Sequence, residues 1–355
     1  MDYKEINNIP MFFIVGRARS GTTLLQTMLD AHPSIIVPGE SCVLMHLKNK
    51  YFKYKIWNNT MVDVFLKDLF QERKLNQFWN LNIEKIRTQI YQIPSDKRTF
   101  PLLMKIIYIN YPSIFEQNKI KQIGDKNPIY TLFIKELIEI YPEAKFIHIV
   151  RDYRANIVSN RDTFSLKNIA TLAHAWIYHN EKVESIKKNI PNKFLLLKYE
   201  DLISQPIKEM ERICDFLKIE YHSSVLEYHL TLNQKIEDDI SQQLKKTHGN
   251  LLQPINSNNI ESWKTKLNKQ DLLLSELIAG EYGTFYGYIT AINEKFIEKN
   301  YIKSIYGNIN NRFINFIIKT YYHSPFIFKK FSALFSKKMN DYFKIKNYYN
   351  QSDFG

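Results

Sequence analysis

Residues 11–33 have the sequence MFFIVGRARSGTTLLQTMLDAHP, and this stretch decides the fold. It begins with five apolar residues, which favour a buried β-strand, and continues into a loop bounded by Gly16 and Gly21. Residues 22–31 then carry apolar side chains at helical spacing, and His32-Pro33 ends that helix. A strand, a glycine-bounded loop and a helix in this order are typical of α/β proteins that bind phosphate-like anions, because the loop and the helix N-terminus offer backbone N–H groups.

The rest of the chain alternates short apolar runs with helical patterns, which predicts a parallel sheet with crossover helices. Further strands are predicted at 35–37, 120–124, 146–150 and 194–197. Residues 41–118 are mostly helical in pattern and are interpreted as an insertion or cap over the core. The predicted fold class is therefore α/β, a P-loop-type parallel sheet flanked by helices, with a helical insertion and a basic C-terminal helical tail.

The 355 residues suit one large domain, predicted at 1–290, followed by a tail at 291–355. The tail has eleven Lys/Arg against four Asp/Glu, so it holds +7 of the net charge of +13. Within it, residues 327–342 place apolar side chains on one helical face and lysines elsewhere, which indicates a basic amphipathic helix. We favour docking of this helix on the protein's own core, with contact to a membrane surface or a partner as the alternative.

Composition narrows the class of protein further. The net charge favours anionic partners but ranks none of them. Cys42 and Cys214 lie far apart, without the spacing of a disulfide framework or a metal site, so no metal is expected. Neither a secretory signal nor a run of transmembrane length is visible. We interpret the chain as a cytoplasmic protein, with peripheral membrane contact as the alternative.

The loop differs from the Walker A pattern at one decisive position. Thr23 holds the usual Ser/Thr place, but Thr22 stands where the lysine that reaches nucleoside triphosphates would be. Arg19 lies inside the loop instead. The loop should therefore bind a diester-like anion with one reactive end rather than a triphosphate with magnesium. A phosphosulfate fits, because Arg19 could neutralise the charge that develops on its bridging oxygen.

A second anion site is predicted after the strand at 146–150. Arg151 follows that strand, at the sheet edge where α/β proteins bind ligands. Ser159 comes eight residues later, a little over two helical turns, so both side chains can face one site. An arginine with a hydroxyl suits a phosphate monoester.

Residues 19–33 resemble the 5′-phosphosulfate-binding segment of the sulfotransferase superfamily, most closely its tyrosylprotein and bacterial branch. The resemblance extends over roughly residues 11–288. It implies 3′-phosphoadenosine-5′-phosphosulfate (PAPS) as sulfuryl donor, with its 3′-phosphate at Arg151 and Ser159. The implied 5′-phosphosulfate ligands are Arg19, Ser20, Gly21, Thr22 and Thr23.

The resemblance also implies the catalytic groups. Residues 124–128, GDKNP, are similar to the family segment whose lysine stabilises the transferring group, and this gives Lys126 that role. Glu40 aligns without a gap to the family's catalytic base, and a carboxylate suits that role if burial raises its pKa. The family has paired acids here, whereas Gly39 precedes Glu40. His46 and His148 are alternatives, although His148 lies in an apolar strand and is expected to be a core histidine.

Two later segments complete the implied nucleotide site. Residues 198–202, KYEDL, resemble a family segment in which Tyr199 would contact the nucleotide. Residues 247–254, which include Thr247, resemble the loop that closes over the 3′-phosphate and adenine. Ser262 stands where the tyrosylprotein branch has lysine before the tryptophan, and Lys264 or Lys266 could substitute for it.

The predicted function is in-line transfer of a sulfuryl group from PAPS to an acceptor hydroxyl. A carbohydrate (glycan) or lipid-linked acceptor is the first choice and peptide tyrosine the second. A P-loop phosphotransferase or NTPase is disfavoured by Thr22. A catalytically idle protein that binds membranes or nucleic acid rests on charge alone, and no nucleic-acid partner is expected.

Overall fold

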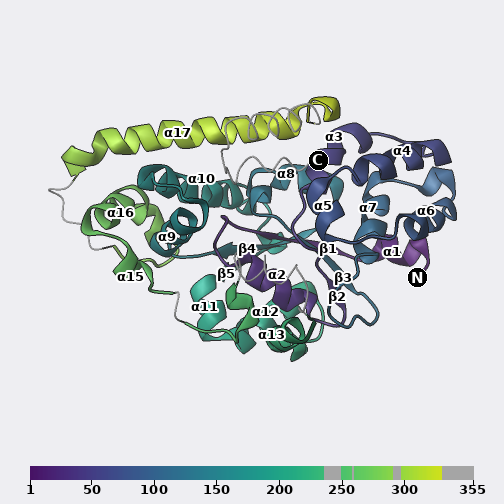
Figure 1. The fold of residues 1–355 in the computed structure, drawn as a ribbon, viewed down its shortest axis with the longest axis horizontal. Helices are drawn as coiled ribbons and strands as arrows, with labels where there is room; N and C mark the ends of the chain where they lie inside the picture. The colour runs from purple at the N-terminus through teal and green to yellow at the C-terminus, as the bar shows by residue number, and fades with distance from the viewer. Residues whose placement is uncertain (236–248, 258–259, 291–296, 330–355) are drawn as a thin grey trace.

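The computed structural model describes residues 1–235, 249–257, 260–290 and 297–329 (Figure 1). Five strands form one all-parallel sheet in the order β2-β3-β1-β4-β5. Their bounds are β1 Met11–Val15, β2 Ile35–Ile36, β3 Gln122–Lys126, β4 Lys145–Val150 and β5 Phe194–Lys198. The predicted α/β class with a parallel sheet is confirmed.

Both faces of the sheet are covered by helices. Because successive strand side chains point to opposite faces, Phe13 and Val15 of β1 join one core and Phe12 and Ile14 join the other. The first core is completed by helices that include α3–α8, and the second by α2 (Thr22–Asp30), α12 (Pro206–Leu217) and α13 (Ser224–Lys235). The strands β1 and β4 are therefore buried on both sides, as their nearly continuous apolar runs predict.

The chain between β2 and β3 is helical. Its helices are α3 (Val43–Tyr51), α4 (Asn59–Leu69), α5 (Arg73–Phe78), α6 (Ile83–Tyr91), the 3₁₀ turn η1 (Ser95–Lys97) and α7 (Phe100–Ile109). Several begin at side-chain caps, such as Asn58, Asn82 and Thr99, whose oxygens accept from backbone N–H groups. The short helix α1 (Tyr3–Asn8) packs on α7.

The third strand lies two residues later than the predicted strand at 120–124. Lys126 pairs in register with Ile14 of β1, so it ends β3 instead of lying in the turn that follows. Apolar content at residue 120 suggested the earlier start, but the pairing with β1 sets the bounds. The 3₁₀ turn η2 (Pro128–Leu132) and α8 (Ile134–Ile140) come next.

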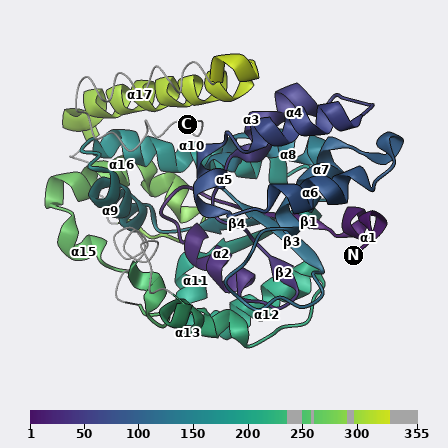
Figure 2. The ribbon, with the colours of Figure 1, turned by 45° about the vertical axis from the view of Figure 1, so that its right-hand side comes forward.

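The remaining helices surround β4 and β5. They are α9 (Tyr153–Phe164), α10 (Ile169–Lys187), η3 (Pro191–Lys193), α11 (Tyr199–Ser204), η4 (Gly249–Leu252), α15 (Trp263–Lys266) and α16 (Lys269–Thr284). A third core cluster joins α9, α10 and α16. The long helix α17 (Ile297–His323) crosses the outside of α10, as both views show (Figures 1 and 2).

The amphipathic segment predicted at 327–342 lies outside the described residues, except for 327–329. In the part of the chain that the structure describes, none of the helices is both long and apolar enough to cross a bilayer.

Candidate active site

The predicted site residues converge at the carboxyl edge of the sheet. The loop at 16–21 follows β1, Lys126 ends β3, Arg151 follows β4 and Tyr199 follows β5. From β1 the chain runs first to β2 and β3 on one side, and later to β4 and β5 on the other. Such a reversal of strand order opens a crevice at the carboxyl ends, which is where ligands bind in open α/β sheets.

The loop at 16–21 is closely packed, and its two glycines are required by space. A Cβ at Gly16 would lie 2.4 Å from the carbonyl oxygen of Ile149, and one at Gly21 would lie 2.4 Å from the ring of Tyr199. Gly21 also has a φ of 95° and is the N-cap of α2. Because this N-cap has no side chain to accept from the first N–H groups of α2, those donors face the crevice and suit an anion.

Helix α9 holds the loop in place. Asn156 Nδ2 donates to the carbonyl oxygen of Ala18 at 2.9 Å and to Ser20 Oγ at 3.0 Å. Asn160 Nδ2 donates to the same carbonyl at 3.0 Å. Both asparagines were missed by sequence reasoning, although their i, i+4 spacing on the helix that carries Ser159 was a usable signal.

Arg19, Ser159, Arg151 and Tyr199 form one cluster, which we call the arginine cluster. Arg19 has a φ of 70°, and its Nε donates to Ser159 Oγ at 3.2 Å. Arg151 Nη1 donates to the Arg19 carbonyl at 3.2 Å, and its guanidinium lies 4.5 Å from the centre of the Tyr199 ring. Burial, and then the charge of Arg151, lower the pKa of Arg19. A half-buried and a buried arginine that repel each other in this way form a favourable place for an anion.

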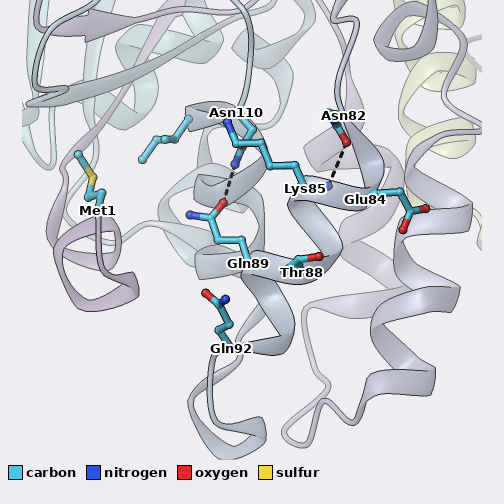
Figure 3. Close-up of a pocket in the computed structure, with 9 residues that line it drawn as sticks. Met1, Asn82, Glu84, Lys85, Thr88, Gln89, Gln92 and Asn110 are labelled. Carbon is cyan, nitrogen blue, oxygen red and sulfur yellow. Dashed lines mark hydrogen bonds between the residues drawn. The ribbon is translucent and has the colours of Figure 1, made fainter.

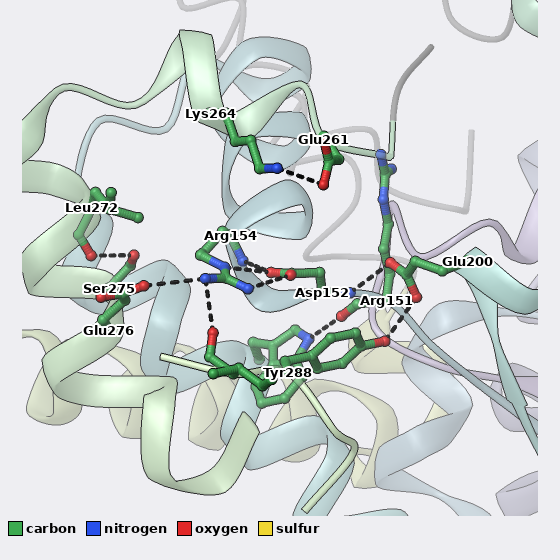
Figure 4. A network of polar contacts seen from close by, with 12 residues as sticks. Arg151, Asp152, Arg154, Glu200, Glu261, Lys264, Leu272, Ser275, Glu276 and Tyr288 are labelled. Atoms are coloured by element: carbon green, nitrogen blue, oxygen red, sulfur yellow. Dashed lines mark hydrogen bonds and ion pairs between the residues drawn. The ribbon is translucent and has the colours of Figure 1, made fainter. Parts of the chain in front are cut away.

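A polar network fixes the backbone at Arg151 (Figure 4). Glu200 Oε1 accepts from the N–H of Asp152 at 3.0 Å, and Trp176 Nε1 donates to the carbonyl of Arg151 at 2.9 Å. Arg154 pairs with Asp152 at 2.7 Å and with Glu276 at 3.1 Å, and the Trp263 ring centre lies 4.0 Å from its guanidinium. Three helices that follow β4 in the chain, α10, α11 and α16, thus fix the backbone around Arg151.

Glu40, Lys126, Lys74 and Thr23 form a second group, which we call the glutamate cluster. Lys126 Nζ contacts Glu40 Oε2 at 3.0 Å and Thr23 Oγ1 at 3.4 Å, and Lys74 Nζ contacts Glu40 Oε1 at 3.2 Å. Lys126 is 2% exposed, whereas the Glu40 side chain is 35% exposed. The Glu40 carboxylate therefore contacts a buried cation while part of its side chain stays exposed to solvent.

The segment before Glu40 is anchored on both sides. Gln26 of α2 donates to the carbonyl oxygens of Val37 and Pro38, at 3.3 and 3.2 Å. Trp79 Nε1 donates to the carbonyl of Gly39 at 2.8 Å. The same helix that carries the loop threonines thus positions the glutamate.

The expectation that burial raises the pKa of Glu40 is wrong for this structure. Burial does act in that direction, but the charges and hydrogen bonds of Lys126 and Lys74 outweigh it and hold the pKa well below its ordinary value. Lys74 was missed by sequence reasoning because it comes from α5, 34 residues further along the chain. No motif marks a lysine that the folding of the cap brings to the site.

Other candidates lie elsewhere. His46 is buried and stacks on Tyr322 with ring centres 5.0 Å apart, and burial lowers its pKa well below the ordinary range. His148 is a buried core histidine, as expected, with Nε2 3.0 Å from Asn180 Oδ1.

The segment around Ser262 is only partly described. Lys264 pairs with Glu261 at 2.6 Å, and Lys266 lies 3.6 Å from Asp162, so both lysines are paired with carboxylates. Thr247 lies outside the described residues.

Two further features of the described residues bear on what the site can hold. Among the described residues, no group of three or more His, Cys, Asp or Glu side chains is arranged to bind a metal ion. A polar hollow lies between α6, the end of α7 and Met1 (Figure 3). None of the predicted site residues lines it, so the candidate site remains the crevice at the sheet edge.

Comparisons with known proteins agree with this geometry. The family model described as "Sulfotransferase family" matches residues 10–223. The chain is similar to a protein-tyrosine sulfotransferase of Drosophila melanogaster, with 23% identity over 74% of this chain and 48% of that protein. It is also similar to an omega-hydroxy-beta-dihydromenaquinone-9 sulfotransferase of Mycobacterium bovis, with 25% identity over 59% of this chain and 62% of that one.

The fold has a counterpart among solved structures. The sulfotransferase domain of the Synechococcus PCC 7002 olefin synthase superposes with a TM-score of 0.53 and 21% identity, over 79% of this chain and 96% of that one. The chain spans about half the length of the Drosophila relative, so the match concerns the domain they share. The family model covers well over half of the chain and includes the loop, Glu40, Lys126, Arg151 and Tyr199, and the chain belongs to the sulfotransferase family.

Proposed function

We propose that the chain transfers a sulfuryl group from PAPS to an acceptor hydroxyl. The observation that carries this proposal is the arginine cluster beside the glycine-bounded loop, where Arg19 and Arg151 lie together at the N-terminus of α2. The family uses PAPS, and the crevice offers backbone N–H groups and two cations for its anionic groups.

The donor would lie along this edge of the sheet. Its 5′-phosphosulfate fits the loop donors, Ser20, Gly21, Thr22 and Thr23, together with Arg19. Its 3′-phosphate fits Arg151 and Ser159, each of which is hydrogen-bonded to Arg19. The Tyr199 ring lies beside Gly21 of the loop and would contact the nucleotide. Thr247 stays a predicted contact of the nucleotide.

The glutamate cluster supplies the chemistry of transfer. The acceptor oxygen forms a bond to sulfur while the bond from sulfur to the bridging phosphate oxygen breaks. Adenosine 3′,5′-bisphosphate leaves with that electron pair, and Glu40 takes the hydroxyl proton. Lys126 and Arg19 neutralise charge on the transferring group and on the leaving oxygen. An anionic donor beside Lys126 offsets the lysine charge, which raises the low pKa of Glu40 toward a useful range.

The acceptor class that we propose is the one that the sequence favours. The two relatives are named for different acceptors, a protein tyrosine and a menaquinone lipid, so the comparisons give an acceptor hydroxyl in general. We propose a carbohydrate or lipid-linked hydroxyl, with peptide tyrosine second. Residues 41–118 are proposed as the cap that shapes its pocket, within a catalytic domain at 1–290. Membrane contact through 327–342 stays a prediction.

Calorimetry with EDTA present tests the donor site. We expect adenosine 3′,5′-bisphosphate to bind without metal, because Thr22 replaces the lysine that triphosphates need. Magnesium-ATP, titrated in a separate buffer without EDTA, serves as the control ligand. Tight binding of magnesium-ATP without binding of the bisphosphate would contradict the proposal and favour an NTPase.

A further inference from the structure

Helix α17 is oriented unlike an ordinary surface helix, because its polar side faces the protein. Asn311 and Asn315 are each 3% exposed, and Gly307 is buried. A Cβ at Gly307 would lie 2.5 Å from the Cβ of Ala170 on α10, so the two helices approach closely there. The attached side is thus small and polar around Gly307, whereas nearer the C-terminal end of the helix Tyr322 packs into the core.

Hydrogen bonds fix this orientation. Asn310 Nδ2 donates to Thr171 Oγ1 of α10 at 3.1 Å, and Asn49 Nδ2 of α3 donates to the carbonyl oxygens of Tyr322 and His323. The middle and the C-terminal end of α17 are therefore held. The helix cannot turn its other side inward without losing these contacts and the close approach at Gly307.

The outward side of α17 is apolar. Ile302 is 80% exposed, Ile309 and Phe313 are each 61% exposed and Phe316 is 66% exposed. We call this side the outer stripe; its other large exposed members are Ile305, Tyr306 and Ile317. At 100° per residue these side chains fall on one continuous face, opposite Gly307 and Asn311. A contiguous exposed apolar surface of this kind marks an interaction site.

Charge indicates what covers the outer stripe. From Lys299 to Asn340 the sequence has no Asp or Glu and eight Lys/Arg, namely Lys299, Lys303, Arg312, Lys319, Lys329, Lys330, Lys337 and Lys338. In the helical projection Lys303 borders one edge of the stripe and Arg312 and Lys319 border the other. A second copy of the chain would bring like charges together, whereas an anionic surface complements them.

We propose that α17 docks the protein on the surface of an anionic lipid bilayer, with the outer stripe in the interface and the flanking cations among the headgroups. An apolar face bordered by Lys and Arg is the usual arrangement of helices that lie in the plane of a membrane. The described helices are not suited to spanning a bilayer, so the contact is peripheral. This inference does not depend on the proposed sulfuryl transfer.

Cosedimentation of the full chain with vesicles tests it. We expect binding to phosphatidylcholine vesicles that contain about one third phosphatidylserine, and much weaker binding to phosphatidylcholine alone. The double variant Ile309→Glu/Phe313→Glu should lower binding by about tenfold or more, because it removes two apolar anchors and adds repelled charges. Both sites are largely exposed, so the melting temperature should stay unchanged.

The matched control is Ile207→Glu/Leu230→Glu. These side chains are 54% and 51% exposed, and their helices α12 and α13 lie on the other side of the sheet from α17 (Figure 1). The control should bind vesicles like the wild type, and both variants should bind adenosine 3′,5′-bisphosphate like the wild type. Because bisphosphate binding is measured separately, failure of the donor site and failure of the docking surface can be distinguished.

Three outcomes would overturn the inference. The wild type could fail to bind anionic vesicles at low salt, or the control variant could lose binding equally. Alternatively, the α17 variant could turn a dimer into a monomer in sedimentation equilibrium, without any vesicle binding, which would identify a second copy as the occupant.

Discussion

The arginine cluster and the glutamate cluster each take one residue, Arg19 and Thr23, from the loop and α2, but their charges are arranged in opposite ways. Arg19 and Arg151 repel each other, and this repulsion contributes to the lowered pKa of Arg19. Glu40 is instead neutralised within the protein by Lys126 and Lys74. The first cluster therefore gains stability when an anion binds, whereas in the second cluster Glu40 is already paired with two lysines, and its pKa must rise before it can accept a proton.

The largest effect is expected at Glu40. Glu40→Gln keeps the shape of the side chain and removes its basicity, so turnover should fall by about 10²–10⁴-fold. Binding of adenosine 3′,5′-bisphosphate should persist, because the arginine cluster is untouched. Steady-state kinetics and calorimetry on the same preparation check both parts, and near-normal turnover would remove Glu40 from its role.

A change in the arginine cluster should lower the affinity for the nucleotide. Arg151→Ala removes a charge-assisted contact, so the affinity for adenosine 3′,5′-bisphosphate should fall by about 1.5–3 kcal/mol, roughly tenfold to 150-fold. Adenosine 5′-phosphosulfate has no 3′-phosphate and serves as the matched ligand, for which little change is expected. Equal losses for both ligands would move Arg151 out of the 3′-phosphate site.

The hydrogen bonds that hold the loop at 16–21 should contribute to the free energy of unfolding. The carbonyl of Ala18 accepts from both Asn156 and Asn160, so either single change to alanine leaves one donor. The double change leaves neither, and we expect it to lower the free energy of unfolding by about 1–3 kcal/mol. Urea denaturation of both single variants and the double variant measures the coupling. Strict additivity would show that the two side chains act separately.

The smallest effect is expected at Lys74. Its charge helps to keep the pKa of Glu40 low, so Lys74→Met should raise that pKa. The basic form of Glu40 is needed for turnover, and the rate falls as pH falls through its pKa, so the acidic limb should move to higher pH. Stability above the unfolded pKa of about 4.3 should fall by less than about 1 kcal/mol, because the pair is partly exposed.

Lys48→Met is the matched control for Lys74, because Lys48 pairs with Glu139 away from the site. It should leave the acidic limb where it is in the wild type. An acidic limb that stays fixed in Lys74→Met would show that Glu40 does not set the acid side of the profile.

The sequence by itself determined the parallel α/β class and the place of the loop. Local signals carry these features: an apolar strand, two glycines at fixed spacing and a helix whose apolar residues share one face. The same local logic placed Arg151 after β4 and gave Thr22 as the residue that replaces the Walker lysine. It also predicted a phosphosulfate-like anion for this loop, because the residues on which that prediction depends are eight consecutive ones.

Tertiary structure alone decided the rest of the site. Lys74 reaches Glu40 only because the helices between β2 and β3 fold back over the crevice, and this contact reverses the expected pKa of the glutamate. The end of β3 at Lys126 depends on its pairing with β1, and the outward direction of the apolar side of α17 depends on Gly307 and the asparagines packing on α10. Charge balance, strand register and helix orientation arise from contacts between distant segments, which no local pattern contains.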